Sequence, residues 1–337
     1  MKKLIPLFIL VFYFLLSSYT FAFAEDIQGT YSVSPVLSQH QTEGIDNFYD
    51  IRWTPSVTES FGLSITNNSN IEKTYEIQVN KAITNKNGII DYSNISKDTS
   101  NAQYKLKELI QLPKQISVPA NSSQEVKGTI AFPSESFNGI LMAGIHVSEK
   151  SDQKQQASVS NTVAYNLPFV VRGNIDQRPT PKLMLSELNI EKLSSDKTSL
   201  NAHLNNEEAN LLKASQLKAE IKDRNNKNVL TQTSKIDITP NTKFIYPIIF
   251  KETLKRGSYK LILTITHGQD KWEFNKIFNI SAKDTALMEQ QHPKQNHHWI
   301  WYMIATIITL IISSIILFKK KNKKRKLNIN KLSRRNK

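Results

Sequence analysis

Four side chains in one short segment can bind a ligand through hydrogen bonds and stacking. They lie within residues 79–93, VNKAITNKNGIIDYS, and are Asn85, Asn87, Asp91 and Tyr92. A sugar offers hydroxyl groups to amides and carboxylates, and an apolar ring face to a phenol. We therefore predict these four residues as a ligand-binding set.

The same segment has the pattern of a β-hairpin. An alternating run from Tyr75 to Ile83 is followed by Asn87-Gly88, a pair that tight turns favour, and then by the run Ile89–Tyr92. A calcium loop is excluded, because its pattern aligned on this pair places Ile83 and Asn94 where the anchoring acids belong. The hairpin is compatible with sugar binding.

Motifs for catalysis, cofactors and metals are absent from the sequence. No nucleophile elbow, phosphate loop, dinucleotide fingerprint or two-histidine zinc helix occurs, so we predict no catalytic residue, no metal ligand and no cofactor. His297 and His298 could bind a metal, but beside Trp299 they fit a polar collar at a membrane interface better. Two acids that meet only in space could still form a glycosidase site. A wall-modifying hydrolase is therefore kept as an alternative.

The elements that must position these residues are mostly strands. Apolar residues alternate with polar ones in further sets, with Lys276 as the one exception: Phe61, Leu63 and Ile65; Leu217, Ala219 and Ile221; Tyr259, Leu261, Leu263 and Ile265; and Trp272, Phe274, Phe278 and Ile280. The last set predicts that Trp272 lies in a core, and an exposed aromatic anchor for a partner is the alternative. A short helix is predicted near 103–111. The fold class is mostly β, with two tandem immunoglobulin-like β-sandwich domains followed by a single C-terminal transmembrane helix.

The domain boundary is predicted from a proline-containing linker. Gly173, Pro179 and Pro181 separate two strand-like runs, which gives a first sandwich over 25–178 and a second over 179–283. An equally polar break near 151–160 leaves the cut open within 150–178. Residues 284–298 lack a sustained period and are predicted to be a stalk, with a helix open for 286–291.

Both ends of the chain carry targeting patterns. Residues 1–24 combine Lys2 and Lys3 with an apolar stretch and a small-residue site, which predicts a signal peptide cleaved between Ala24 and Glu25. Residues 299–318 are uncharged and mostly apolar, the length a membrane-spanning helix needs. The predicted interface residues are Trp299, Trp301, Tyr302, Lys319, Lys320 and Lys321.

The charge distribution excludes nucleic acid as a partner. The net charge is +15, but residues 319–337 hold 11 Lys and Arg and no acid, and Lys2 and Lys3 add two more positive charges. A net charge of +2 therefore remains for residues 4–318. This bias predicts a cytoplasmic tail, an extracellular N-terminal region and contact with the plasma membrane. With no cysteine, the exported domains must be held by packing alone. We predict a single-pass protein of the cell membrane in a Gram-positive bacterium.

Several stretches are similar to the WxL-interacting proteins of Gram-positive bacteria. They are YSVSPVLSQHQ, NFYDIRWTPS, LSITNNSNIEKTYEIQVNKAITNKNGIIDYS and FPSESFNGILMAGIHV in the first half, and LKRGSYKLILTI with KWEFNKIFNIS in the second. The likeness is strong over 31–150 and extends over nearly the whole chain. One departure is Ser56, at a position where members of the family commonly have glycine.

The resemblance implies a surface adaptor. Its first domain would bind peptidoglycan and its second the WxL domain of secreted surface proteins, so that these partners are tethered to the wall. Such a protein acts by bridging and not by turnover. A purely structural spacer is the other alternative.

Overall fold

The computed structural model describes residues 30–95, 98, 100–150, 163–194, 197–291 and 303–305. The described residues form two compact units. The larger holds those up to 191 with 199–249 and 258–279, and the smaller holds the remainder. Strands dominate the larger unit, so the mostly-β prediction is confirmed.

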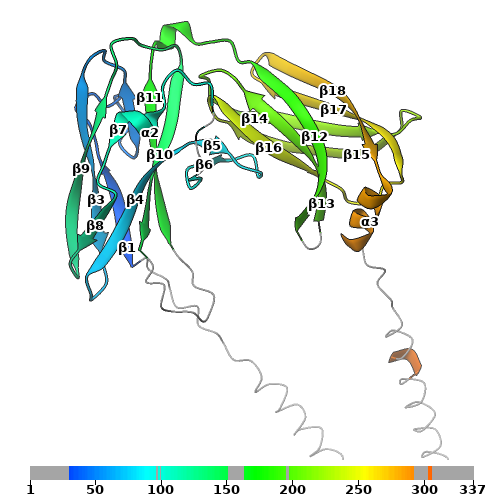
Figure 1. Ribbon diagram of the computed structural model, residues 1–337, viewed down its shortest axis with the longest axis horizontal. Helices are drawn as coiled ribbons and strands as arrows, with labels where there is room; N and C mark the ends of the chain where they lie inside the picture. Colours follow the sequence, from blue (N-terminus) through cyan, green and yellow to red (C-terminus); the bar gives the residue numbers. More distant parts are fainter. Residues whose placement is uncertain are drawn as a thin grey trace, which may run out of the picture. The chain divides into compact units, whose positions relative to one another are not determined.

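The first half of the larger unit is a sandwich of two sheets (Figure 1). One sheet has the order β1 (Tyr31–Val36), β3 (Thr58–Asn67), β9 (Ser122–Ala131) and β7 (Ile110–Gln111). The other has the order β2 (Tyr49–Arg52), β11 (Ala164–Arg172), β10 (Ile140–Glu149), β4 (Lys73–Lys81) and β8 (Gln115–Val118). The β11–β2 pair is parallel, whereas β1–β3, β3–β9, β9–β7, β11–β10, β10–β4 and β4–β8 are antiparallel.

The inward faces of these two sheets form the first core. The strict alternation of β3 buries Phe61, Leu63 and Ile65 and turns Ser60 and Thr66 outward. Four large rings are completely or almost completely buried: Tyr31, Tyr49, Tyr75 and Phe169. Apolar burial on this scale is what holds a domain without disulfides together.

The second half of the described chain is built from two further sheets. Their orders are β12 (Leu183–Ser194), β13 (Lys197–Asn206), β16 (Thr242–Ile249), and β15 (Asn228–Ile238), β14 (Leu212–Lys222), β17 (Gly257–His267), β18 (Asp270–Ile280). Leu217, Ala219 and Ile221 are buried as their spacing predicts. On β18 only Phe278 and Ile280 are fully buried, whereas Trp272 and Phe274 are half-buried because β18 is the last strand of its sheet.

Helices in the described part of the chain are short. They are α2 (Leu106–Leu109), the 3-10 helix η1 (Ile175–Gln177) and α3 (Ala282–Gln291). The helix expected near 103–111 is shorter than predicted, because Ile110 leaves it to pair with Ile130 as strand β7. Helix α3 occupies the start of the segment predicted to be a stalk.

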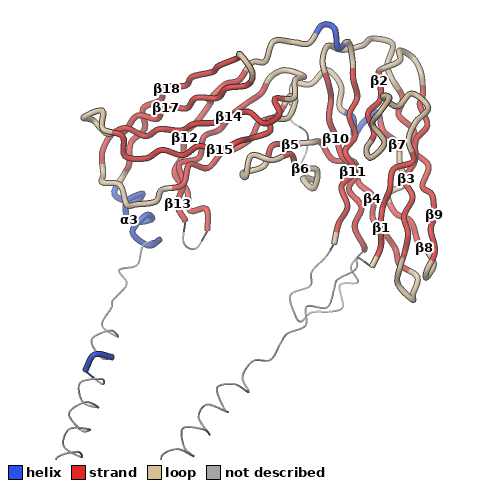
Figure 2. The backbone as a smooth tube through the Cα atoms, turned by 180° about the vertical axis from the view of Figure 1, so that it is seen from behind, coloured by secondary structure: helices blue, strands red, loops and turns tan. Residues whose placement is uncertain are grey.

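The predicted hairpin is present as β5 (Ile83–Thr84) and β6 (Ile90–Asp91), drawn beside β10 in Figure 2. Its turn is closed by Gly88 N–H donating to the Asn85 carbonyl at 2.9 Å. Of the Asn87-Gly88 pair only Gly88 has a positive φ, +75°. A single left-handed residue after the turn is enough for a loop of this length.

The fold-class prediction is wrong in its last element. Among the described residues, no helix has the length and apolar content needed to cross a membrane. A spanning helix needs about 20 residues, whereas α3 has 10 and includes Lys283, Asp284 and Glu289. The predicted span 299–318 lies outside the described residues except for 303–305.

Other predictions also fall outside the described ranges. These are the signal peptide with Ala24 and Glu25, the interface residues Trp299, Trp301, Tyr302, Lys319, Lys320 and Lys321, and the tail 319–337.

Candidate functional site

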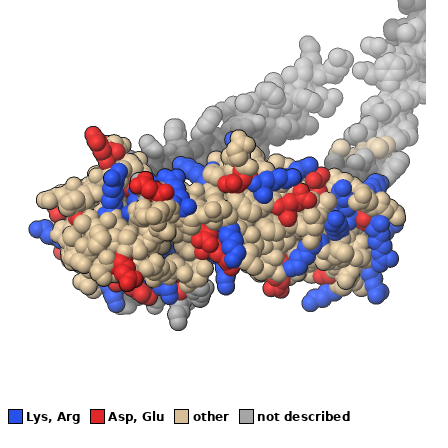
Figure 3. Space-filling view, turned by 90° about the horizontal axis from the view of Figure 1, so that it is seen from above, with Lys and Arg blue, Asp and Glu red and all other residues tan. Residues whose placement is uncertain are grey.

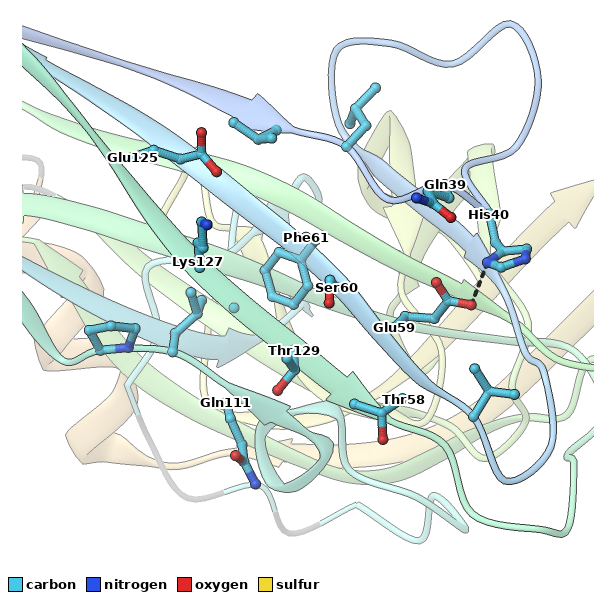
Figure 4. Close-up of a pocket in the computed structure, with 16 residues that line it drawn as sticks. Gln39, His40, Thr58, Glu59, Ser60, Phe61, Gln111, Glu125, Lys127 and Thr129 are labelled. Carbon is cyan, nitrogen blue, oxygen red and sulfur yellow. Dashed lines mark ion pairs between the residues drawn. The ribbon is translucent and has the colours of Figure 1, made fainter.

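A trough of about 930 Å³ lies along the β1-β3-β9-β7 sheet. Its lining residues are Val36, Leu37, Gln39, His40, Val57, Thr58, Glu59, Ser60, Phe61, Gln111, Leu112, Pro113, Glu125, Lys127, Gly128 and Thr129. Figure 4 shows the polar side chains of β3 and β9 around the Phe61 ring, with Gln39 and His40 on the loop that follows β1. The trough is thus a hollow in the first sandwich whose lining mixes polar and apolar side chains.

Strand register explains why this face is hollow. The antiparallel pairing of β3 with β9 sets Ser60 opposite Thr129 and Gly62 opposite Lys127, so β3 contributes only small groups to the middle of the face. Residues directly opposite each other share a face of the sheet. A Cβ on Gly62 would lie 2.9 Å from the Val126 carbonyl oxygen. A larger residue at this position would therefore fill or distort the floor.

A second glycine, Gly128, leaves room for the Phe61 ring. A Cβ on Gly128 would lie 2.6 Å from Leu112 Cδ2 and 2.8 Å from Phe61 Cζ. Glycine at this position lets both apolar side chains pack closely under the trough.

A hydrogen-bonded carboxylate, that of Glu59, lies at one end of the trough. Glu59 is only 5% exposed, and its Oε2 accepts a hydrogen bond from Ser38 Oγ at 2.9 Å. Its Oε1 lies 2.6 Å from His40 Nδ1, the ion pair drawn in Figure 4. The Ser38 hydroxyl thus compensates part of the burial of this acid, whereas the buried Oε1 accepts no hydrogen bond from the described residues.

The other end of the trough carries exposed charges of both signs. Glu125 and Lys127 are exposed and lie two residues apart on β9, with Gln111 on the neighbouring strand. Among the described residues neither of these two charges forms an ion pair. They are therefore available to a ligand that has hydroxyl, amide and carboxylate groups.

The described residues contain no metal centre. No group of three or more His, Cys, Asp and Glu side chains among them is arranged to hold an ion. Acidic and basic side chains are interspersed over the face drawn in Figure 3. Such mixing is unlike the basic stripe of a nucleic-acid interface.

The four residues predicted as a ligand-binding set come together in the β5–β6 hairpin. Asn85 Oδ1 accepts hydrogen bonds from the N–H groups of Asn87 and Ile89, at 2.9 and 3.3 Å. Asp91 Oδ1 accepts from Ser93 N–H and Ser93 Oγ, both at 2.7 Å. Asn87 is exposed. Two of the polar groups thus already have local turn partners, and their ligand binding stays a prediction.

Tyr92 has a different environment. Its ring lies against Gly144, where an added Cβ would be 2.5 Å from Tyr92 Cβ. Burial, and then the charge of Asp237, raise the pKa of Tyr92 to about 12. This phenol is consequently a neutral group that lines a second cavity, on the other sheet of the sandwich.

Sequence reasoning missed the trough because its two main strands are far apart in the chain. Alternation places Ser60, Lys127 and Thr129 on outward faces. It does not show that the segments around 60 and 129 are neighbours.

Comparison with known families gives two matches that together span most of the chain. Residues 31–149 match the model described as "WxL Interacting Protein, peptidoglycan binding domain". Residues 154–290 match the "host binding domain" of the same protein. Both models describe binding domains, so the chain is a binding protein and not an enzyme.

No curated protein matches the sequence. Among solved structures, a chaperone–tip adhesin complex of CFA/I fimbriae biogenesis is 10% identical, with a TM-score of 0.31, and the match covers 74% of this chain and 98% of that one. A chaperone–tip adhesion subunit complex from the Csu pili of Acinetobacter baumannii is 13% identical, with a TM-score of 0.33, covering 73% and 98%.

Proposed function

Because this chain belongs to the WxL-interacting protein family, we propose that it is a cell-surface adaptor whose first sandwich binds peptidoglycan and whose second binds a protein. Export by the signal peptide predicted over residues 1–24 is part of the proposal. The protein acts by holding two components together.

The observation that carries the peptidoglycan proposal is the position of the trough. All of its lining residues lie between Val36 and Thr129, inside the range that matches the peptidoglycan-binding model. Its volume falls within the range of about 300–1,000 Å³ that is usual for ligand sites. This position supports the proposal that the wall polymer binds on the β3–β9 face.

The chemistry of the trough suits a glycan that carries short peptides. Gln39, Gln111 and Thr129 offer hydrogen-bonding groups for sugar hydroxyls and N-acetyl amides. Lys127 offers a positive charge for the carboxylates of the peptides, and Glu125 accepts hydrogen bonds from hydroxyl and amine groups. One long, open site can contact several units of the polymer.

Sacculus binding tests this site against the hairpin. The full chain, a Glu125→Gln/Lys127→Gln variant and an Asn85→Ala/Asp91→Ala variant are sedimented with purified sacculi. A Lys107→Gln/Glu108→Gln variant has the same change in charge on exposed residues of α2 and is the matched control.

The trough variant should lose about tenfold in affinity while the control binds as wild type. Loss in the hairpin variant alone would move the site to the four residues predicted from the sequence. Unchanged binding in every variant would refute both locations, and a chain that binds neither sacculi nor protein would be a spacer.

The second sandwich is proposed to bind the WxL domain of partner proteins. Strand β18 offers an edge for this contact, because it is the last strand of its sheet, with Trp272 and Phe274 half-buried and Ile277 72% exposed. Aromatic side chains at such positions are frequent anchors of protein interfaces. Immobilised WxL domain should retain the full chain and release an Ile277→Lys variant.

A second function for this region is favoured by the name of the matching model, "host binding domain". The same variant and wild type are therefore also applied to a host extracellular-matrix preparation. Retention by the matrix and not by the WxL domain would assign the second sandwich to the host.

A further inference from the structure

The second cavity has a volume of about 370 Å³ and lies on the outer face of the β2-β11-β10-β4-β8 sheet. Its apolar lining is formed by Phe48, Ile90, Tyr92, Ile140, Met142, Pro168, Val170, Ala209 and Leu211. The volume is sufficient for a small organic molecule. This cavity shares no residue with the trough on the opposite sheet.

The apolar floor is unusual for the outer face of a sandwich. Met142 and Val170 point away from the first core, yet they are only 8% and 7% exposed. The hairpin residue Tyr92 and the segment before β14 cover them, with Ile140 N–H donating to the Ala209 carbonyl at 2.8 Å. Protein interiors rarely leave a void larger than a water molecule. A space of this size under a tight cover is therefore a candidate binding cavity.

One positive charge is held in place at this cavity by a buried acid. Asp50 is completely buried and accepts from Arg172 Nε at 2.6 Å and from Arg172 Nη2 at 2.7 Å. Thr42 Oγ1 donates to the same carboxylate at 2.8 Å. The hydrogen bonds to Asp50 raise the pKa of Arg172, so the guanidinium stays charged. The two-point contact fixes the plane of the guanidinium at the wall of the cavity.

Two further cations lie on the cavity wall. Arg178 and Lys213 are exposed, and no ion pair joins either to an acid among the described residues. The charged residues of the lining are thus three bases and Asp50, a formal balance of +2. An apolar space beside such a balance is complementary to an anion with an apolar body.

We propose that this cavity binds an aliphatic carboxylate, with its chain against Met142, Val170 and Tyr92 and its headgroup against Arg172, Arg178 and Lys213. The charged end compensates the excess positive charge, and the chain fills space that is otherwise empty. The expected ligand is a free fatty acid of medium length.

Equilibrium dialysis of the full chain against labelled decanoate tests the proposal. We expect saturable binding of one decanoate per chain, and binding of decan-1-ol at least tenfold weaker because it lacks the charge. An Arg178→Gln/Lys213→Gln variant should also lose about tenfold. Lys235→Gln/Lys243→Gln removes two positive charges from exposed lysines on β15 and β16 outside the cavity; it is the matched control and should bind as wild type.

A cavity-filling variant tests the location. Leu211→Trp should abolish decanoate binding. Thermal melting shows whether this variant is folded; if it is not, the Arg178→Gln/Lys213→Gln variant tests the location instead. Equal affinity for decanoate and decan-1-ol, or unchanged affinity in the double variant, would overturn the proposed headgroup contacts. The absence of saturable decanoate binding to wild type would overturn the site. Sacculus binding is a separate measurement on the other sheet, so the two proposals fail independently.

Discussion

The two outer faces of the first sandwich have opposite chemistry although they belong to one domain. On the β3–β9 face the outward residues are polar, as at Ser60 and Thr129, and they line an open trough. On the β10–β11 face Met142 and Val170 are apolar and buried. The difference teaches that what covers a sheet, and not the sheet itself, decides what its outer face can bind.

Part of the cover is the β5–β6 hairpin with Tyr92, and hydrogen bonds fix this hairpin to strand β15. The Gly88 carbonyl accepts from Asp237 N–H at 2.7 Å. The Thr84 hydroxyl donates to the Asp237 carbonyl at 2.8 Å and accepts from Thr239 N–H at 3.0 Å. One hairpin thus joins elements from the ranges of both family models. Changes in these contacts should affect the covered face more than the open one.

Gly88→Val should have the largest effect. Gly88 has φ +75°, and a Cβ there would lie 2.3 Å from Ile236 Cγ2, so the variant adds backbone strain and overpacking. Together they should lower the free energy of unfolding by about 3 kcal/mol, measured by urea denaturation of the full chain.

Gly44→Val is the matched control for this change. Gly44 has φ +79°, but an added Cβ would meet no atom within 4 Å. This variant should cost only the strain, about 1 kcal/mol. Equal losses in the two variants would show that the hairpin does not press on Ile236.

Thr84→Val should have the next largest effect. The side chain of Thr84 is 2% exposed, and the variant removes the hydroxyl that satisfies the Asp237 carbonyl and the Thr239 N–H. The expected loss is about 2 kcal/mol in the same measurement, because buried polar groups are left without partners. Thr129→Val on the open face should change stability by less than about 0.5 kcal/mol. Similar losses at both sites would contradict the comparison.

Acid should weaken a second contact near the hairpin. Lys81 Nζ lies 3.2 Å from Asp98 Oδ1 and donates to the Asn241 carbonyl at 2.5 Å. Burial alone would raise the pKa of Asp98, but hydrogen bonds from Ser100 and the charge of Lys81 outweigh it and lower this pKa from 3.8. A carboxyl whose pKa is lower in the folded than in the unfolded state stabilises the fold at pH values above its unfolded pKa. This stabilisation is lost as the pH falls through the folded pKa.

The melting temperature of wild type should therefore fall more steeply between about pH 5 and pH 2 than that of Asp98→Asn. Burial lowers the pKa of Lys81 below 10.5. We expect Lys81 to remain protonated in the folded and unfolded states over this acidic range, so that Asp98 determines the direction in which stability changes with pH. The ion pair should contribute at most about 1 kcal/mol. Parallel profiles for the two proteins would show that Asp98 does not stabilise the fold.

Ser56→Gly should have the smallest effect, and a favourable one. Val57 N–H donates to the Thr54 carbonyl at 3.2 Å, and Ser56 has φ +60° at the third position of this turn, where glycine is preferred. The variant should stabilise the chain by about 0.5 kcal/mol, since relief of strain is partly offset by a more flexible unfolded state. A destabilised variant would show that the Ser56 side chain contributes more than its strain costs.

The sequence by itself determined the local elements and the family. Alternation identified the strands around Leu63 and Leu217, and Asn87-Gly88 marked the turn. These signals are local, because the period of side chains along a strand depends only on backbone geometry. The stretches that resemble the WxL-interacting proteins lie in the ranges matched by its two domain models. The apolar run 299–318 predicted a membrane helix that no described helix supports.

Only the tertiary structure decided which strands are neighbours and which faces are covered. The trough needs Ser60 beside Thr129, and the second cavity needs Asp50 beside Arg172. Periodicity cannot encode contacts between residues so far apart in the chain, because it assigns residues to faces without saying what lies above them. Tyr92 illustrates the point: the sequence predicted a ligand-binding phenol, and the fold placed its ring over Gly144 at the edge of an apolar cavity. The physical reason is that burial is a property of packed surfaces and not of single segments.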